Sequence, residues 1–135
     1  MGWAVTTVDD QTGAEAKPSA SDRKFLKELS AGITSLVLLA LLAEAQEPLY
    51  GYLIAKRLDA DSGDGLPVKQ GTLYPVLRSL EAKSLLSSFV EPSASGPPRR
   101  YYSITPAGRD SLRSWKQAWA GTRDFVDAVL EGHHV

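Results

Sequence analysis

One stretch of the chain, KQGTLYPVLRSLEAKSLL at residues 69–86, combines a helical apolar pattern with donors that could contact DNA bases. Its apolar residues recur at intervals of four and three positions, at Leu73, Leu77 and Leu80. That spacing predicts a helix whose apolar side packs on the protein. The opposite side would carry Gln70 and Arg78, whose side chains have the donors that read base edges in the major groove.

The start of this predicted helix suits a second kind of contact, to the phosphate backbone. Gly71 and Thr72 can bring backbone amides close to a phosphate, because the first amides of a helix have no acceptor within it. Pro75 is tolerated only in or near the first turn, so we expect the helix to begin close to Gly71 or Thr72. Lys69 and Pro75 would then also face outward. An ordinary amphipathic helix with a Gly-Thr start is the alternative interpretation.

A β-hairpin is predicted directly after this helix, with two arginines at its tip. The runs LLSSFV (85–90) and RYYSIT (100–105) are rich in aromatic and β-branched residues, and the segment EPSASGPPR between them is full of turn formers. We therefore expect a long tip that carries Arg99 and Arg100. Such a wing would hold phosphates beside the groove with its cations. The alternative is a solvated loop whose arginines protect a sheet edge.

The sequence offers no set of residues for catalysis or for a metal site. It contains no cysteine, which excludes disulfides, thiolate metal sites and a cysteine nucleophile. Its two histidines are His133 and His134 at the extreme C-terminus, away from any predicted element. Because no nucleophile and base can be paired, we expect no enzyme activity, no cofactor and no metal.

The charge balance leaves two classes of macromolecular partner open. The whole chain has a formal net charge of −1, whereas residues 22–113 contain 12 basic and 10 acidic residues, a net charge of +2. So weak a field predicts modest, salt-sensitive affinity if the partner is DNA. The alternative is a domain that binds a partner protein. Polar side chains on the predicted contact surface favour DNA, whereas exposed apolar ones there would favour protein.

The predicted elements follow the order helix, helix, helix, hairpin, helix. Apolar residues at helical spacing begin at Phe25, and this first helix should end before Pro48. A second helix should start near Tyr50 and end in the Gly- and Asp-rich loop at 59–65. Three helices followed by a hairpin predict an α+β, mainly helical fold, with a winged helix-turn-helix DNA-binding domain at residues 22–105.

The N-terminal segment adds no further element to this predicted fold, and no membrane-spanning segment is predicted. Residues 1–21 mix small and polar residues without periodicity, and we expect them to form a mobile N-terminal tail. The longest apolar run, LVLLALLA at 36–43, is far shorter than the roughly 18 residues of a membrane span. No secretory signal is visible at the N-terminus. We therefore expect a cytoplasmic protein without a membrane partner.

A single long helix is predicted from about Pro106 to Leu130, within a C-terminal dimerisation segment at residues 106–132. Its residues at alternating intervals of three and four positions form an a/d seam: Leu112, Trp115, Trp119, Thr122, Val126 and Val129. We interpret it as a contact between two copies of the chain. The start of the first helix would add a second surface to that contact, through Phe25, Leu29 and Ile33. The alternative is a cavity for flat aromatic ligands, walled by the two indoles.

Three strings of the chain together resemble the PadR family of bacterial transcriptional regulators: PLYGYLIAKRL, GTLYPVLRSLEAKSLL and GPPRRYYSITPAG. The resemblance covers about residues 25–113. It implies a dimeric winged helix-turn-helix that binds palindromic operator DNA, in the branch of the family with a single C-terminal dimerisation helix. It further implies that an aromatic effector could bind at the dimer interface, as in some members.

The resemblance also assigns positions. It implies that Tyr50 and Tyr52 belong to the second-helix motif, that residues 71–75 start the recognition helix, and that residues 99–102 end the wing. Taken together, we expect a homodimeric repressor, released by a small planar aromatic effector. Its expected contacts with double-stranded DNA are Tyr50, Lys69, Gln70, Gly71, Thr72, Tyr74, Pro75, Arg78, Arg99 and Arg100. A winged-helix protein–protein interaction module is the alternative function.

Overall fold

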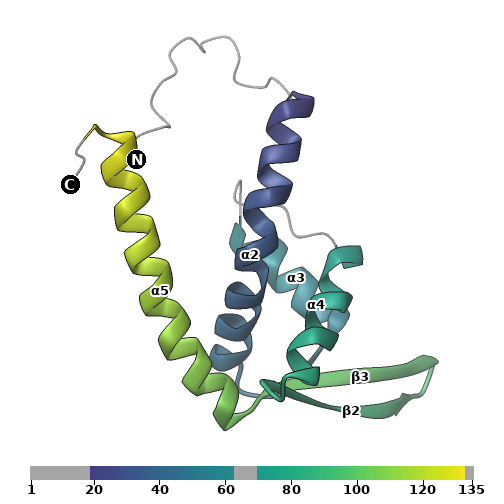
Figure 1. Ribbon diagram of the computed structural model, residues 1–135. Helices are drawn as coiled ribbons and strands as arrows, with labels where there is room; N and C mark the ends of the chain where they lie inside the picture. Colours follow the sequence, from purple (N-terminus) through teal and green to yellow (C-terminus); the bar gives the residue numbers. More distant parts are fainter. Residues whose placement is uncertain (1–18, 63–69, 133–135) are drawn as a thin grey trace.

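Four helices and a small antiparallel sheet make up the part of the chain that the computed structural model describes, residues 19–62 and 70–132. In chain order they are α2 (Ala20–Glu44), β1 (Leu49–Tyr50), α3 (Gly51–Ser62), α4 (Gln70–Ala82), β2 (Leu86–Ser93), β3 (Gly96–Ile104) and α5 (Pro106–Leu130). The sheet has the strand order β1-β3-β2 and lies at one end of the molecule, with the helices rising from it (Figure 1). The expected mainly helical α+β fold is confirmed.

A core rich in leucine fixes α4 on the rest of the domain. Leu38 and Leu39 of α2, Ile54 of α3, and Leu73 and Leu77 of α4 are completely buried. Burial of each such side chain contributes roughly 1.5–3 kcal/mol. The sequence predicts that the apolar side of this helix packs on the protein, and the buried leucines of α4 do hold that side against α2 and α3.

Helix α2 begins earlier than its apolar pattern. The Ser19 hydroxyl accepts a hydrogen bond from the Asp22 amide, and the Asp22 carboxylate accepts one from the Ser19 amide. This capping box starts the helix at Ala20, five residues before Phe25. By length and composition α2 could also cross a membrane, a test that core helices of soluble proteins pass as well. Here its C-terminal half supplies much of the domain core.

A short strand directly precedes the second helix, which begins close to Tyr50 as predicted. Leu49 and Tyr50 form β1 and pair with Tyr102 and Tyr101 of β3. Helix α3 then starts at Gly51 and ends at Ser62, within the segment 59–65 where its end was predicted. A Cβ atom on Gly51 would lie 2.6 Å from the Tyr74 hydroxyl, so glycine permits the close approach of α3 to α4.

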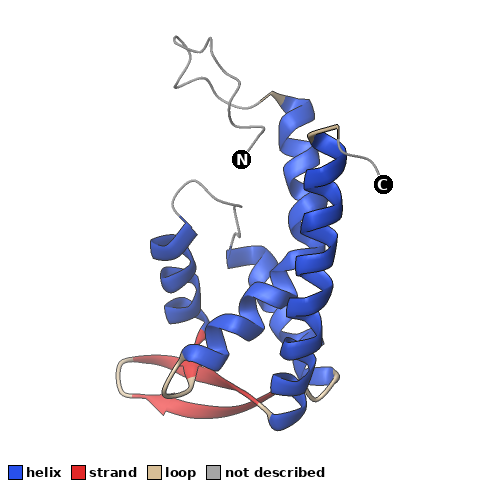
Figure 2. Cartoon of the chain, turned by 90° about the vertical axis from the view of Figure 1, so that its left-hand side faces the viewer, coloured by secondary structure: helices blue, strands red, loops and turns tan. Residues whose placement is uncertain are grey.

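The prediction of a long hairpin tip was wrong. Strands β2 and β3 extend until Ser93 and Gly96 face each other, which leaves a turn of two residues, Ala94 and Ser95. Figure 2 shows the two strands as a long ribbon projecting from the base of the helices. The turn formers that suggested a long loop lie mostly inside the strands.

A β-bulge explains how prolines fit in this hairpin. Between the pairs Glu91–Arg99 and Ser93–Gly96, one residue of β2 faces two of β3. The residues at the bulge are Pro92, Pro97 and Pro98. Proline has no amide hydrogen to donate, so sheets accept it at bulges and edges. As a consequence, Arg99 and Arg100 lie within β3 and not at the tip.

Helix α5 matches its predicted bounds and is fixed at its start. Thr105 caps it, since its hydroxyl accepts from the Gly108 amide at 2.9 Å and donates to the Ser84 carbonyl at 2.7 Å. A Cβ atom on Gly108 would collide with the Leu85 carbonyl and lie 2.7 Å from Ile104 Cγ1. Beyond this anchored start, α5 and α2 diverge toward their far ends (Figure 1).

Candidate nucleic-acid interface

The two sides of α4 differ as the leucine spacing predicts. Leu73, Leu77 and Leu80 are buried, and the exposed residues are Gly71, Thr72, Pro75, Arg78 and Ser79. Arg78 thus has access to a ligand in front of the helix. Lys69 lies outside the described residues, and Gln70 begins α4 with a side chain that is not described.

Two residues of α4 occupy positions that the sequence did not indicate. Pro75 is the sixth residue of the helix and not part of its first turn, so it has no amide to donate to the Gly71 carbonyl. That carbonyl belongs to the exposed side of α4. Tyr74 is half-buried and its ring lies over Gly51, so this predicted DNA contact also joins α4 to α3.

One face of the sheet and the start of α3 carry a row of aromatic rings that the sequence did not indicate. The Tyr101 ring stacks on Phe89 with centroids 5.4 Å apart and meets the Tyr50 ring edge-on at 5.3 Å. Tyr50 in turn stacks on Tyr52 at 6.4 Å. We call these four residues the aromatic row. Because side chains alternate between the two faces along β2 and β3, the sequence could have suggested that Phe89 and Tyr101 share a face. No sequence pattern marks β1, which adds Tyr50.

Cations lie over two rings of the aromatic row. The guanidinium carbon of Arg99 lies 4.4 Å from the centre of the Tyr50 ring, and Lys56 Nζ lies 5.8 Å from the centre of the Tyr52 ring. Both distances are within the range of a cation–π interaction. Arg99 and Tyr50, both predicted DNA contacts, are therefore brought together.

The opposite face of the hairpin holds Arg100. Its Nη1 donates to the Ser88 hydroxyl at 2.9 Å, and that hydroxyl donates to Glu81 Oε2 at 2.6 Å. The chain of bonds joins β3 to β2 and to the end of α4. Tyr102 lies on this same face, where burial raises the pKa of its hydroxyl and the Glu81 carboxylate raises that pKa further.

The predicted dimer residues divide between the core and the surface. Leu112 is buried in the core of its own chain, and Trp115 packs against that core. Further along α5, Trp119, Val126 and Val129 are exposed by about 40%. On α2, Phe25 and Leu29 are exposed and Ile33 is half-buried. The exposed apolar residues of this set therefore lie on the diverging ends of α2 and α5.

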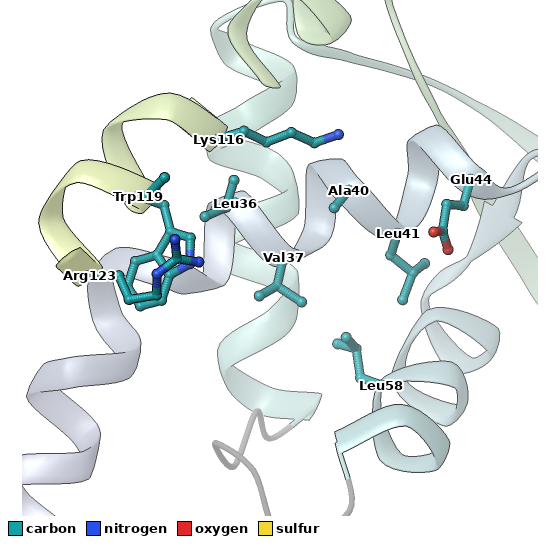
Figure 3. A pocket seen from close by; sticks show the side chains of 10 residues that line it. Leu36, Val37, Ala40, Leu41, Glu44, Leu58, Lys116, Trp119 and Arg123 are labelled. Carbon is teal, nitrogen blue, oxygen red and sulfur yellow. The ribbon is translucent and has the colours of Figure 1, made fainter. Parts of the chain in front are cut away.

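A groove of about 400 Å³ lies between these helices (Figure 3). Its walls are mainly apolar and come from α2, α3 and α5: Leu36, Val37, Ala40, Leu41, Glu44, Leu58, Lys116, Trp119, Ala120 and Arg123. Trp119 lines the groove and Trp115 does not, so the two indoles do not form its walls together. Within residues 19–62 and 70–132, no three side chains of metal-binding type lie close together.

Comparison with known proteins settles the family. The family model described as "Transcriptional regulator PadR-like family" matches residues 38–114, more than half of the chain. The chain belongs to the PadR-like family of transcriptional regulators. The match spans α3, α4, the hairpin and the start of α5, the elements that carry the candidate interface.

Solved structures agree with this assignment to the PadR-like family. A PadR family transcriptional regulator from Eggerthella lenta is 37% identical, with a TM-score of 0.68 over 81% of this chain and 91% of that one. A PadR-like transcriptional regulator from Bacillus cereus is 28% identical, with a TM-score of 0.61 over 76% and 96% of the two chains.

A relative in Mycobacterium tuberculosis, the transcriptional regulator Rv3488, is 39% identical over 74 residues, which are 55% of this chain and 65% of that protein. This PadR-like protein is thus a DNA-binding regulator of transcription and not an enzyme.

Proposed function

We propose that this PadR-like regulator is a cytoplasmic repressor that binds a palindromic operator as a homodimer. The observation that carries the proposal is the two-sided character of α4, in which buried leucines hold the helix while Thr72 and Arg78 stay exposed. A helix held in this way can enter the major groove with its polar side toward the bases. The wing would then contact phosphates beside the groove.

The homodimer is supported by apolar side chains that have little to pack against within one chain. Phe25 is 59% exposed on α2, and Phe125 is 66% exposed on α5. The exposed part of the α5 seam is only about two heptads long, too short for a stable coiled coil by itself. We propose that α2 of one copy packs against α5 of the other. A two-fold axis would then place two α4 helices about one DNA turn apart.

The groove beside Trp119 supports the effector proposal. Its volume of about 400 Å³ lies in the range of sites for small ligands, and most of its lining is apolar. A planar aromatic compound could stack on the Trp119 indole there. Such a ligand would release the operator only if it bound the DNA-free arrangement of the dimer more tightly than the DNA-bound one.

Selection of bound sequences from random duplex DNA tests the proposed operator. The expected product is an inverted repeat with half-site centres about 10 base pairs apart, bound by two chains, with an affinity that falls as salt rises. A selected site without two-fold symmetry, bound by one chain, would contradict the homodimer. Retention on DNA that does not depend on salt would contradict groove binding as a whole.

Fluorescence quenching tests the proposed effector site. Planar aromatic compounds should quench the wild-type protein, and Trp119→Ala should abolish the saturable part of that quenching. Trp115→Phe is the matched control, because Trp115 does not line the groove. Saturable quenching that survives Trp119→Ala would show that the ligand binds elsewhere.

A further inference from the structure

The two neighbouring arginines of the wing differ in what holds them. Arg99 and Arg100 are adjacent in β3, so their side chains leave opposite faces of the hairpin. Arg100 is hydrogen-bonded to Ser88 and through it to Glu81. Arg99 lies over the Tyr50 ring, and within the described residues its guanidinium has no hydrogen bond or ion pair. The two positive charges are therefore not equivalent.

The sheet register explains why Tyr50 and Arg99 meet. Tyr50 pairs directly with Tyr101 across the β1–β3 ladder, and Arg99 lies two residues before Tyr101 on the same face. Diagonal neighbours of this kind are within reach of long and aromatic side chains. The Tyr50 ring also contacts the Tyr101 and Tyr52 rings, which limit its movement. Arg99 thus rests on a ring that is itself fixed at the start of the helix-turn-helix.

A guanidinium in a cation–π contact keeps its hydrogen-bond donors available. The contact with the ring comes from the positive charge of the guanidinium and uses none of its five N–H donors as a hydrogen bond. Arg99 can therefore remain on Tyr50 and bind a phosphate oxygen at the same time. Arg100 would first have to give up its bond to Ser88.

We propose that Arg99 is the phosphate-binding arginine of the wing and that Tyr50 is its positioning residue. This inference rests on the proposed function, since it assigns roles within DNA binding. Tyr50 restricts the Arg99 side chain before DNA arrives, so less side-chain entropy is lost on binding. Fixing one long side chain costs about 0.5–1.5 kcal/mol, which corresponds to about twofold to tenfold in affinity. Arg100 instead takes part in the hydrogen bonds that join the hairpin to α4.

The test measures affinity for the selected operator between 50 and 200 mM salt. Arg99→Ala should reduce the slope of log K against log[salt] by about 0.9, the value for one lost phosphate contact. Tyr50→Leu should weaken binding about twofold to tenfold with an unchanged slope, since Arg99 keeps its charge. Tyr50→Phe retains the ring and should bind like the wild type. Arg100→Ala should leave the slope unchanged.

A double-mutant cycle decides whether Tyr50 acts through Arg99. In the Arg99→Ala background, Tyr50→Leu should have no further effect on affinity. An equal loss in both backgrounds would overturn the positioning role, as would a loss in Tyr50→Phe, which would assign the contact to the hydroxyl. A smaller slope in Arg100→Ala and not in Arg99→Ala would overturn the phosphate assignment. If the wild type shows no salt-dependent DNA binding, the proposed function itself fails.

A second measurement uses the free protein and does not depend on how well Tyr50→Leu folds. NMR relaxation of the arginine Nε–Hε groups should show Arg99 more restricted than Arg109, an exposed arginine at the start of α5. Tyr50→Phe should preserve the restriction of Arg99. Equal mobility of Arg99 and Arg109 in the wild type would overturn the inference.

Discussion

Arg78 is exposed, and it lies on a helix whose other side is fixed by buried leucines. Arg78→Ala should cost on the order of 1–3 kcal/mol of operator affinity if the lost contact is to a base edge, and preference should relax at one operator position. Competition between operator variants measures both effects. Arg109→Ala removes the same charge from α5 and should leave the preference at every position unchanged. A similar loss on all sequences in Arg78→Ala would assign Arg78 to the backbone.

Tyr102 predicts how stability depends on alkaline pH. Its pKa is raised in the folded protein, first by burial and then by the Glu81 carboxylate. Above the unfolded value of about 10, the unfolded chain releases this proton while the folded chain keeps it. The free energy of unfolding must therefore fall as pH rises through the folded pKa. Urea unfolding between pH 8 and 11 should show a shallower fall in Tyr102→Phe, and parallel alkaline curves would exclude this contribution.

The start of α5 packs closely against the residues before it, at Gly108. Gly108→Ala would push a methyl group into the Leu85 carbonyl and Ile104, and overpacking of this kind costs typically 1–3 kcal/mol. Gly121→Ala is the control on the same helix, because a Cβ atom there meets nothing within 4 Å. It should stabilise the protein by up to about 1 kcal/mol through helix propensity. Denaturation midpoints that move in the same direction for both variants would contradict the anchor.

Elements with many local signals could be predicted, and those that depend on distant partners could not. Helix α5 was found within its bounds because Thr105, Pro106 and a long apolar pattern all mark it. Strand β1 was missed because two residues carry no period, and only pairing with β3 makes them a strand. The prolines of the hairpin favoured a loop, since the bulge that accommodates them is a property of two strands together.

The residues of the candidate site also differ in whether local sequence signals could predict their positions. The exposed side of α4 followed from leucine spacing, which is local. The separation of Arg99 from Arg100 needed the register of β3, and the contact with Tyr50 needed β1 as well. Leu112 was assigned to the seam by spacing alone, but it belongs to the buried core of its own chain.

Assembly of two copies and DNA binding should be inseparable. Val126→Asp places a charge on the exposed apolar surface of α5, where a second copy would bury it without a partner. The variant should sediment as a monomer and lose operator binding. Gln117→Asp, an exposed position of α5 outside the seam, should remain dimeric. A wild-type protein that sediments as a monomer at micromolar concentration would end the dimer model.

The continuity of α2 has a mechanical consequence. It is one uninterrupted helix of 25 residues, roughly 37 Å long at 1.5 Å per residue. One half is built into the core that holds α4, and the other half would lie against the second copy. A tilt of about 5° at one end displaces the other end by about 3 Å, close to the rise of one base pair. A small change of angle between the two copies would therefore move the far end of α2 by about one base-pair step. The stiffness of α2 would then determine which operator spacings the regulator tolerates.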